Sequence, residues 1–251
     1  PSDLVTPLRG IRAAVSPSPR VLYARGSDLA DDLPVLDLAG RSVLATREGA
    51  PGLRVEYFNG QKFEGTPVAT ATDTAVNAAW KDGAPRAGMN PDDFSVRWSG
   101  QFRPVQSGTY RLGLTGTMKF QLYLNDSLVV RSVYAQHDGE YPDPRTVQSA
   151  PLQLDTGKTY ALRIEAEETY GDASLQLVAS VPHETLAAEA ERVARQADAV
   201  VMVMGLTARL EGEEMPVAIE GFRGGDRTRI DLPPAQERLL ERITALGKPT
   251  V

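Results

Sequence analysis

The chain has 251 residues, enough for one large domain or two ordinary ones that each bury a core. Its 27 basic and 33 acidic side chains give a formal net charge of -6, which argues against a nucleic-acid or anionic-membrane partner. The lack of cysteine excludes disulfides and thiolate chemistry, and with two histidines a zinc site would need several carboxylates.

Residues 1–49 predict a short amphipathic helix followed by a brief strand. The apolar residues at helical spacing are Leu4, Val5, Leu8, Ile11 and Ala14. Prolines 17 and 19 end this helix, and residues 21–24 indicate the strand.

From Gly52 to about Val181 apolar and polar residues alternate, and turn signals recur roughly every 8 to 12 residues, which is typical of an antiparallel β-sandwich. Trp98 and Phe102 lie in strand patterns, so we expect them in its core rather than in a sugar platform. The expected hairpins join 110–114 to 120–124 and 152–154 to 160–164, with a further turn at Asn125-Asp126.

After Val181 the pattern changes to helices around one apolar strand. Thr185 is expected to cap a helix that ends near Ala197, and residues 199–204 predict a strand buried on both faces of a parallel sheet. Pro233-Pro234 open a second helix, Gly247 ends it, and residues 248–251 begin another strand.

These patterns predict an α+β multidomain protein in which a β-sandwich is inserted into a partial α/β sandwich domain. The expected segments are residues 1–49, the insert 50–182, and residues 183–251. The chain begins at Pro1 and stops where a strand should start, so we expect a part of a longer protein.

An acidic cluster follows the apolar strand. Glu211, Glu213 and Glu214 lie within four residues, where ligands of parallel sheets bind, beyond the carboxyl ends of the strands. The alternative is a solvated acidic loop. For Arg227 an ion pair with Asp226 that fixes the loop is favoured over a contact with substrate. Gly221, Gly224 and Gly225 suit tight turns that hold the loop.

The chain resembles glycoside hydrolase family 3 in the α/β-sandwich domain that follows the barrel of that family. The segments that carry the resemblance are residues 5–11, 21–26, 197–205, 210–215, 225–227 and 231–233. They lie on both sides of the expected insert.

The insert resembles the PA-fourteen domain, a protective-antigen-type β-sandwich found in carbohydrate-active proteins. The segments that carry this resemblance are residues 52–58, 94–100, 107–110 and 122–126. Members that hold calcium are expected to show paired Asp where this chain has Thr115-Gly116-Thr117-Met118. We therefore assign no metal and no cofactor.

The family 3 resemblance implies a retaining glycosidase, which needs two carboxyl groups about 5 to 5.5 Å apart. It implies that the nucleophile is an Asp on a barrel that is missing from this sequence, and that Glu213 is the acid/base. Glu211 and Glu214 are neighbours that could exchange roles with it. Tyr134 and His137, on the long loop 131–150, could contact sugar and restrict the length of substrate.

We therefore expect part of an exo-acting β-glucosidase that acts on oligosaccharides, with β-xylosidase or a non-catalytic carbohydrate-binding module as alternatives. The isolated chain should be inactive, and the insert could mediate a homodimer. No apolar stretch approaches the roughly 20 residues of a membrane span. We expect a secreted or periplasmic protein.

Overall fold

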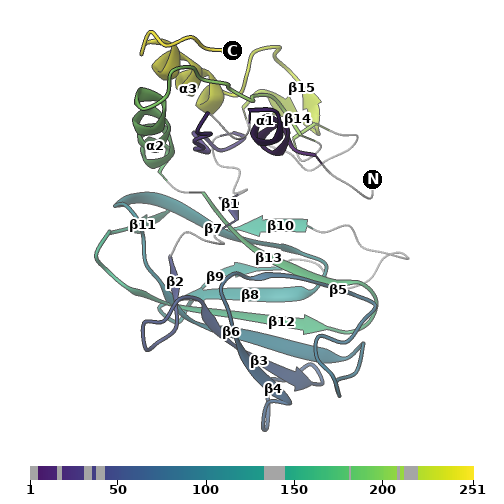
Figure 1. Cartoon of the computed structure of the whole chain (residues 1–251). Helices are drawn as coiled ribbons and strands as arrows, with labels where there is room; N and C mark the ends of the chain where they lie inside the picture. The colour runs from purple at the N-terminus through teal and green to yellow at the C-terminus, as the bar shows by residue number, and fades with distance from the viewer. Residues whose placement is uncertain are drawn as a thin grey trace. The chain divides into compact units, whose positions relative to one another are not determined.

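The computed structural model describes residues 5–15, 19–30, 36–37, 43–132, 145–180, 182–207, 210–211 and 220–251. The chain divides into two compact units, Pro34–Pro182 and the pair of segments Pro1–Leu33 and His183–Val251 (Figure 1). The first unit is built almost entirely of strands and the second contains the helices.

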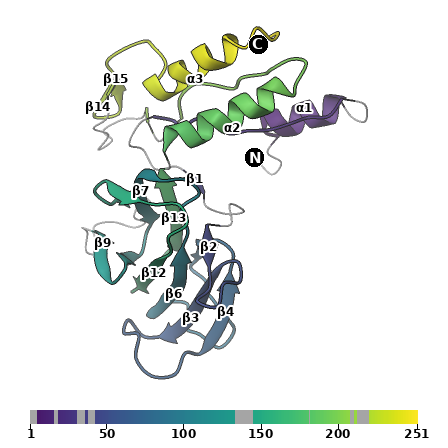
Figure 2. The same cartoon turned by 90° about the vertical axis from the view of Figure 1, so that its left-hand side faces the viewer.

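The β unit consists of two antiparallel sheets packed as a sandwich (Figures 1 and 2). The larger sheet has the order β4(Ala69–Asp73), β3(Leu53–Asn59), β6(Phe94–Phe102), β12(Tyr160–Glu168), β8(Lys119–Leu124), β9(Ser127–Arg131), with β2(Leu44–Ala45) also on β6. The smaller has the order β1(Leu36–Asp37), β13(Ala173–Ser180), β7(Gly108–Gly116), β10(Arg145–Gln148), with β11(Leu152–Leu154) on β7 and β5(Asn77–Lys81) on β13.

The core of this sandwich holds large rings whose polar atoms are satisfied. Trp98 is 1% exposed and its Nε1 donates to Asp73 Oδ2 at 2.9 Å. Tyr110 is equally buried, donates to the Gln106 carbonyl at 2.8 Å, and packs edge-to-face on Phe102 of the opposite sheet. The prediction that Trp98 and Phe102 belong to the core is confirmed.

The two predicted hairpins are wrong, although the strands themselves form. β7 and β8 follow one another in the chain but lie in different sheets, and so do β11 and β12. Alternation along a strand shows which face is buried but not which strand lies beside it, because both sheets present apolar inner faces to one core. The predicted turn at Asn125-Asp126 is confirmed, with positive φ of 49° and 62°, as a type I′ hairpin loop requires.

Two residues of the predicted segment 1–49 pair with a strand of the sandwich. Leu44 and Ala45, which the sequence pattern assigns to the segment 1–49, pair in register with Phe102 and Gln101 of β6. They are therefore strand residues of the sandwich.

The helical unit contains α1(Pro7–Val15), α2(His183–Arg195) and α3(Pro234–Thr244) (Figure 2). The helices α2 and α3 pack through an apolar cluster that Ala24 also contacts. The buried members of this cluster are Ala187, Ala190, Ala194, Leu239 and Ile243. The predicted short helix before Pro17 and the predicted helix from Pro234 both form. α2 begins before Thr185, so that residue does not cap it.

The apolar run at 199–204 lies extended and begins a parallel pairing with the end of the chain. Val200 N donates to Pro249 O at 2.8 Å, and Val251 N donates back to Val200 O at 3.0 Å. Val200 and Met202 pack on the α2/α3 cluster, whereas Val201 and Val203 are 57% and 68% exposed.

Among the described residues of this chain, α2 and α3 cover one of the two alternating faces of the run, and the predicted burial of the other face is not seen. Residues 21–24 are also described, and they form no strand. Among the described parts of the chain, no helix is long and apolar enough to cross a membrane.

Candidate functional site

The loop that carries the acidic cluster leaves the apolar run at Gly205. The backbone of Gly205 has a φ of 138°, an angle that residues other than glycine rarely adopt. Gln236, in the first turn of α3, binds both backbone groups of Gly205: its Oε1 accepts from the amide and its Nε2 donates to the carbonyl, each at 2.8 Å. The entry to the loop is thereby tied to α3.

A small apolar cluster anchors the next part of the loop. Leu210 is fully buried against Ala30 and Phe222, with Leu29 and Leu206 packed around them. A turn follows from this anchor, since the amides of Leu210 and Glu211 both donate to the Thr207 carbonyl, at 2.9 and 3.1 Å.

Glu211 follows the buried Leu210 and is itself exposed. The predicted acid/base Glu213 and its neighbour Glu214 lie outside the described residues, as do Tyr134 and His137. Their assignments stay predictions. Among the described residues, no group of three or more His, Asp or Glu side chains could hold a metal ion.

The far side of the loop is a hairpin of β14(Phe222–Arg223) and β15(Asp226–Arg227). Gly224 and Gly225 form its two-residue turn, with φ of 62° and 94°. Both values are positive, so this turn needs glycine or a residue with a short polar side chain at each position. The prediction that these glycines make a tight turn is confirmed.

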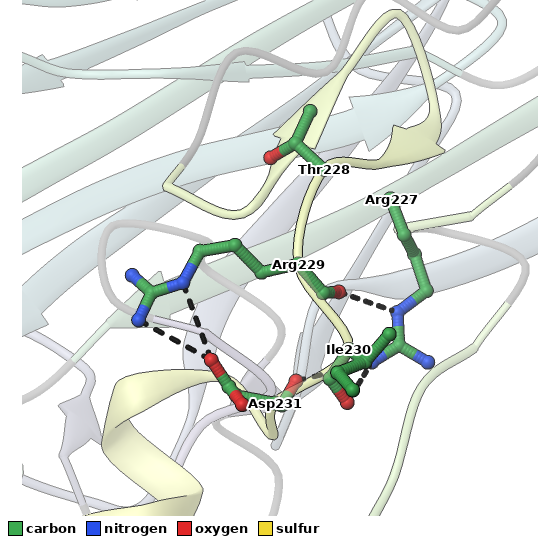
Figure 3. Close-up of a pocket in the computed structure, with 5 residues that line it drawn as sticks. All are labelled: Arg227, Thr228, Arg229, Ile230 and Asp231. Carbon is green, nitrogen blue, oxygen red and sulfur yellow. Dashed lines mark hydrogen bonds and ion pairs between the residues drawn. The ribbon is translucent and has the colours of Figure 1, made fainter.

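Arg227 fixes the segment between this hairpin and α3 (Figure 3). Its Nε donates to the Arg229 carbonyl at 3.2 Å, and its Nη2 donates to the carbonyls of Ile230 and Asp231 at 2.7 and 3.1 Å. The predicted ion pair with Asp226 is wrong, because neighbouring strand residues point to opposite faces. None of these hydrogen bonds reaches Glu211.

Residues 227–231 line a shallow hollow on the surface (Figure 3). Arg229 bridges two carboxylates there, with Nη1 2.9 Å from Glu220 Oε1 and Nη2 3.3 Å from Asp231 Oδ2. Ile230 is 93% exposed beside them.

Sequence reasoning missed Gln236 and Arg229. A glutamine in the first turn of a helix carries no motif, and its role emerges only when Gly205 and Leu29 are brought to it. Arg229 stands among several arginines and acids, so its partners could not be chosen from the sequence.

The family model "PA14 domain" matches residues 49–186, which is more than half of the chain. The chain belongs to the PA14 domain family. The expected fold class, with a PA14-type β-sandwich as its larger part, is confirmed by this match and by the two sheets described above.

Relatives extend the similarity beyond the PA14 domain. A xylan 1,4-beta-xylosidase of Xylanibacter ruminicola is 30% identical over 259 residues, covering 100% of this chain and 28% of the relative. A beta-glucosidase of Rhizobium radiobacter is 26% identical, covering 95% and 27%. A solved beta-glucosidase from Kluyveromyces marxianus in complex with glucose shares the fold, with a TM-score of 0.58, 22% identity, and coverage of 99% of this chain and 29% of that one.

The chain thus spans between a quarter and a third of the length of these relatives. These relatives are named as a β-xylosidase and a β-glucosidase, the two enzyme types that the resemblance to glycoside hydrolase family 3 implied. The similarity includes the helical unit on both sides of the PA14 domain, since it covers nearly the whole chain.

Proposed function

We propose that this chain is the part of an exo-acting retaining β-glycosidase, a β-glucosidase, that supplies the acid/base loop and a PA14 domain that restricts substrate length. The observation that carries the proposal is the match to β-glucosidases and a β-xylosidase over 95% and more of the chain. It is supported by a buried anchor, Leu210, directly before the acidic cluster.

In the proposed reaction, a carboxylate on the missing barrel attacks C1 of the terminal sugar while Glu213 gives its proton to the leaving oxygen. The glycosidic C1–O bond breaks and a C1–O bond to the enzyme forms. Glu213, now ionised, then removes a proton from water, and the resulting attack on C1 releases the sugar and restores both carboxyl groups.

A proton donor near neutral pH needs a raised pKa, which burial or a nearby like charge provides. Glu211 and Glu214 are close in sequence and supply like charge. We further propose that Tyr134 and His137 of the PA14 domain contact the sugar chain beyond its terminal residue.

Glu213→Gln in the full-length parent tests the assignment. Hydrolysis of alkyl glycosides, whose leaving groups need protonation, should fall by about 10²- to 10⁴-fold, while dinitrophenyl glycosides should be largely spared in the step that forms the enzyme-bound sugar. The matched control is Glu211→Gln, which removes a neighbouring charge and should have a smaller effect. Unaltered alkyl glycoside turnover by the Glu213 variant would reject the assignment.

The isolated 251-residue chain should not hydrolyse aryl glucosides, because its nucleophilic partner is elsewhere. Turnover of aryl glucosides by the purified chain would show instead that both carboxyl groups lie within it. The preference between glucosides and xylosides is therefore measured with the full-length parent protein.

β-Xylosidase is the second candidate, favoured by the 30% identity to the xylan 1,4-beta-xylosidase. A comparison of kcat/KM for 4-nitrophenyl glucoside and xyloside decides between the two. A sugar-binding role for the PA14 domain alone predicts saturable binding of oligosaccharides to the isolated chain, measured by calorimetry, and a domain that only limits access predicts none.

A further inference from the structure

Gln236 makes three hydrogen bonds to the backbone from one nearly buried amide. The residue is 4% exposed and lies in the first turn of α3. Its Oε1 accepts from Gly205 N, and its Nε2 donates to the carbonyls of Gly205 and Leu29, each at 2.8 Å. Both Nε2 hydrogens and one oxygen lone pair are therefore used.

Gln236 and Gly205 are joined by two hydrogen bonds of opposite direction, like two paired strand residues. The amide accepts from and donates to the same residue, so the two bonds together fix the position and the orientation of that part of the backbone. Gly205 has a φ of 138°, and the two bonds hold this unusual conformation in place.

This contact lies at the point where both ends of the candidate loop meet. Gly205 ends the apolar run, and Pro233, which precedes α3, ends the loop at its other side. The third bond reaches Leu29, which packs in the cluster of Leu210. One side chain therefore joins the loop entry, the loop exit and the segment that supports the loop anchor.

We propose that Gln236 is a positioning residue for the acid/base loop, and that it sets the direction in which the chain leaves Gly205 toward Glu213. This inference rests on the proposed function. The amide is needed because an apolar side chain of similar size would leave one partly buried N–H and two partly buried carbonyls without these partners. A carboxylate would place negative charge against the two carbonyl oxygens.

The test uses Gln236→Leu and Gln236→Glu in the full-length parent, assayed with one alkyl and one dinitrophenyl glycoside. Because a displacement of about 1 Å can lower a rate about 10²-fold, we expect kcat for the alkyl glycoside to fall by about 10- to 100-fold. The kcat/KM for the dinitrophenyl glycoside, which reports the formation of the enzyme-bound sugar and needs little proton donation, should fall by less than about 3-fold. The Gln236→Glu variant should recover part of this loss at acid pH, where the protonated carboxyl donates again.

The matched control is Ile243→Val, a buried substitution two turns along the same helix in the α2/α3 cluster. It should lower stability without changing the ratio of the two rates. An equal loss of both rates in the Gln236 variants, or a ratio changed equally by Ile243→Val, would overturn the positioning role.

The Glu213→Gln assay and a hydrogen-exchange measurement distinguish a failure of the positioning role from a failure of the proposed function. If Glu213→Gln shows a leaving-group-dependent loss and the Gln236 variants do not, the positioning role fails while the proposed function stands. If Glu213→Gln shows none, the proposed function itself fails. In the isolated 251-residue chain, the Gly205 amide should exchange hydrogen faster in Gln236→Leu than in the native sequence. An unchanged exchange rate would contradict the proposed hydrogen bonds between Gln236 and Gly205.

Discussion

Single residues at the edges of the core decide how closely the strands of the sandwich approach. Gly116 ends β7 between β13 and β10, and pairs with Leu175 on one side and Arg145 on the other. A Cβ at this position would lie 2.2 Å from the Ser174 carbonyl oxygen and 3.1 Å from Leu175 Cα. Both neighbours are backbone atoms, which cannot move without separating the strands.

Gly116→Ala should therefore destabilise the sandwich by about 1–3 kcal/mol, the range typical of overpacking. Urea unfolding followed by tryptophan emission measures it, because both tryptophans of the chain, Trp80 and Trp98, lie in the sandwich.

Gly10→Ala is the matched control for this substitution. Gly10 lies in α1, where a Cβ would meet only Val5 at 3.8 Å. Alanine stabilises a helix interior by roughly 0.5–1 kcal/mol relative to glycine. The tryptophan transition should be unchanged in this variant, and equal midpoints for the two variants would contradict the steric argument.

At the scale of elements, α2 and α3 are held together by an apolar seam and an ion-pair network. Small alanines on α2 let Leu239 and Ile243 of α3 approach closely. Arg242 donates to both carboxylate oxygens of Glu184, at 2.7 and 3.0 Å, and to Glu191. The hydrogen bonds from Arg242 hold the pKa of Glu184 below its ordinary value and raise the pKa of the guanidinium.

This network predicts a pH-dependent contribution to stability. Because the pKa of Glu184 is lowered in the folded state, its contribution is complete above the unfolded pKa of about 4.3 and is lost as pH falls through the lower folded value. Glu184 is 64% exposed, so the contribution at pH 7 should stay below about 1 kcal/mol.

Glu184→Gln should lower the thermal unfolding midpoint measured by circular dichroism at pH 7, and the difference from the native protein should shrink toward pH 3. Glu189→Gln, on the same helix, is the control, since the described residues give Glu189 no ion pair. A difference that persists unchanged at pH 3 would show that the hydrogen bonds act without the charge.

The sequence predicted most of the helices and strands but few of the segments that they pair with. Period-two alternation and turn residues predicted the sandwich, because they reflect local burial and local backbone angles. The neighbours of β7 depend on contacts between distant segments, so the predicted hairpin to β8 failed. In the candidate loop, Gly224 and Gly225 were readable as a turn, whereas the partners of Arg227 and Gln236 depend on side-chain direction and tertiary contact.

At the scale of the whole molecule, each unit has a core of its own. The helical unit is assembled from both ends of the chain: Gln236 binds the Leu29 carbonyl, and Ala24 packs with α2 and α3. The PA14 unit carries the other core, with Trp98, Tyr110 and Phe102 almost fully buried. Its first and last strands are neighbours, since Leu36 of β1 pairs with Ala179 of β13.

Because its two ends meet in one sheet, the PA14 unit should fold when residues 34–182 are expressed alone. Excision leaves every strand of both sheets with its partner and removes no member of the tryptophan-containing core. We expect a single cooperative transition in urea whose tryptophan-detected midpoint equals that of the 251-residue chain. A lower midpoint or a broad transition in the excised unit would show that the helical unit contributes to the stability of the sandwich, and that the two cores are coupled rather than independent.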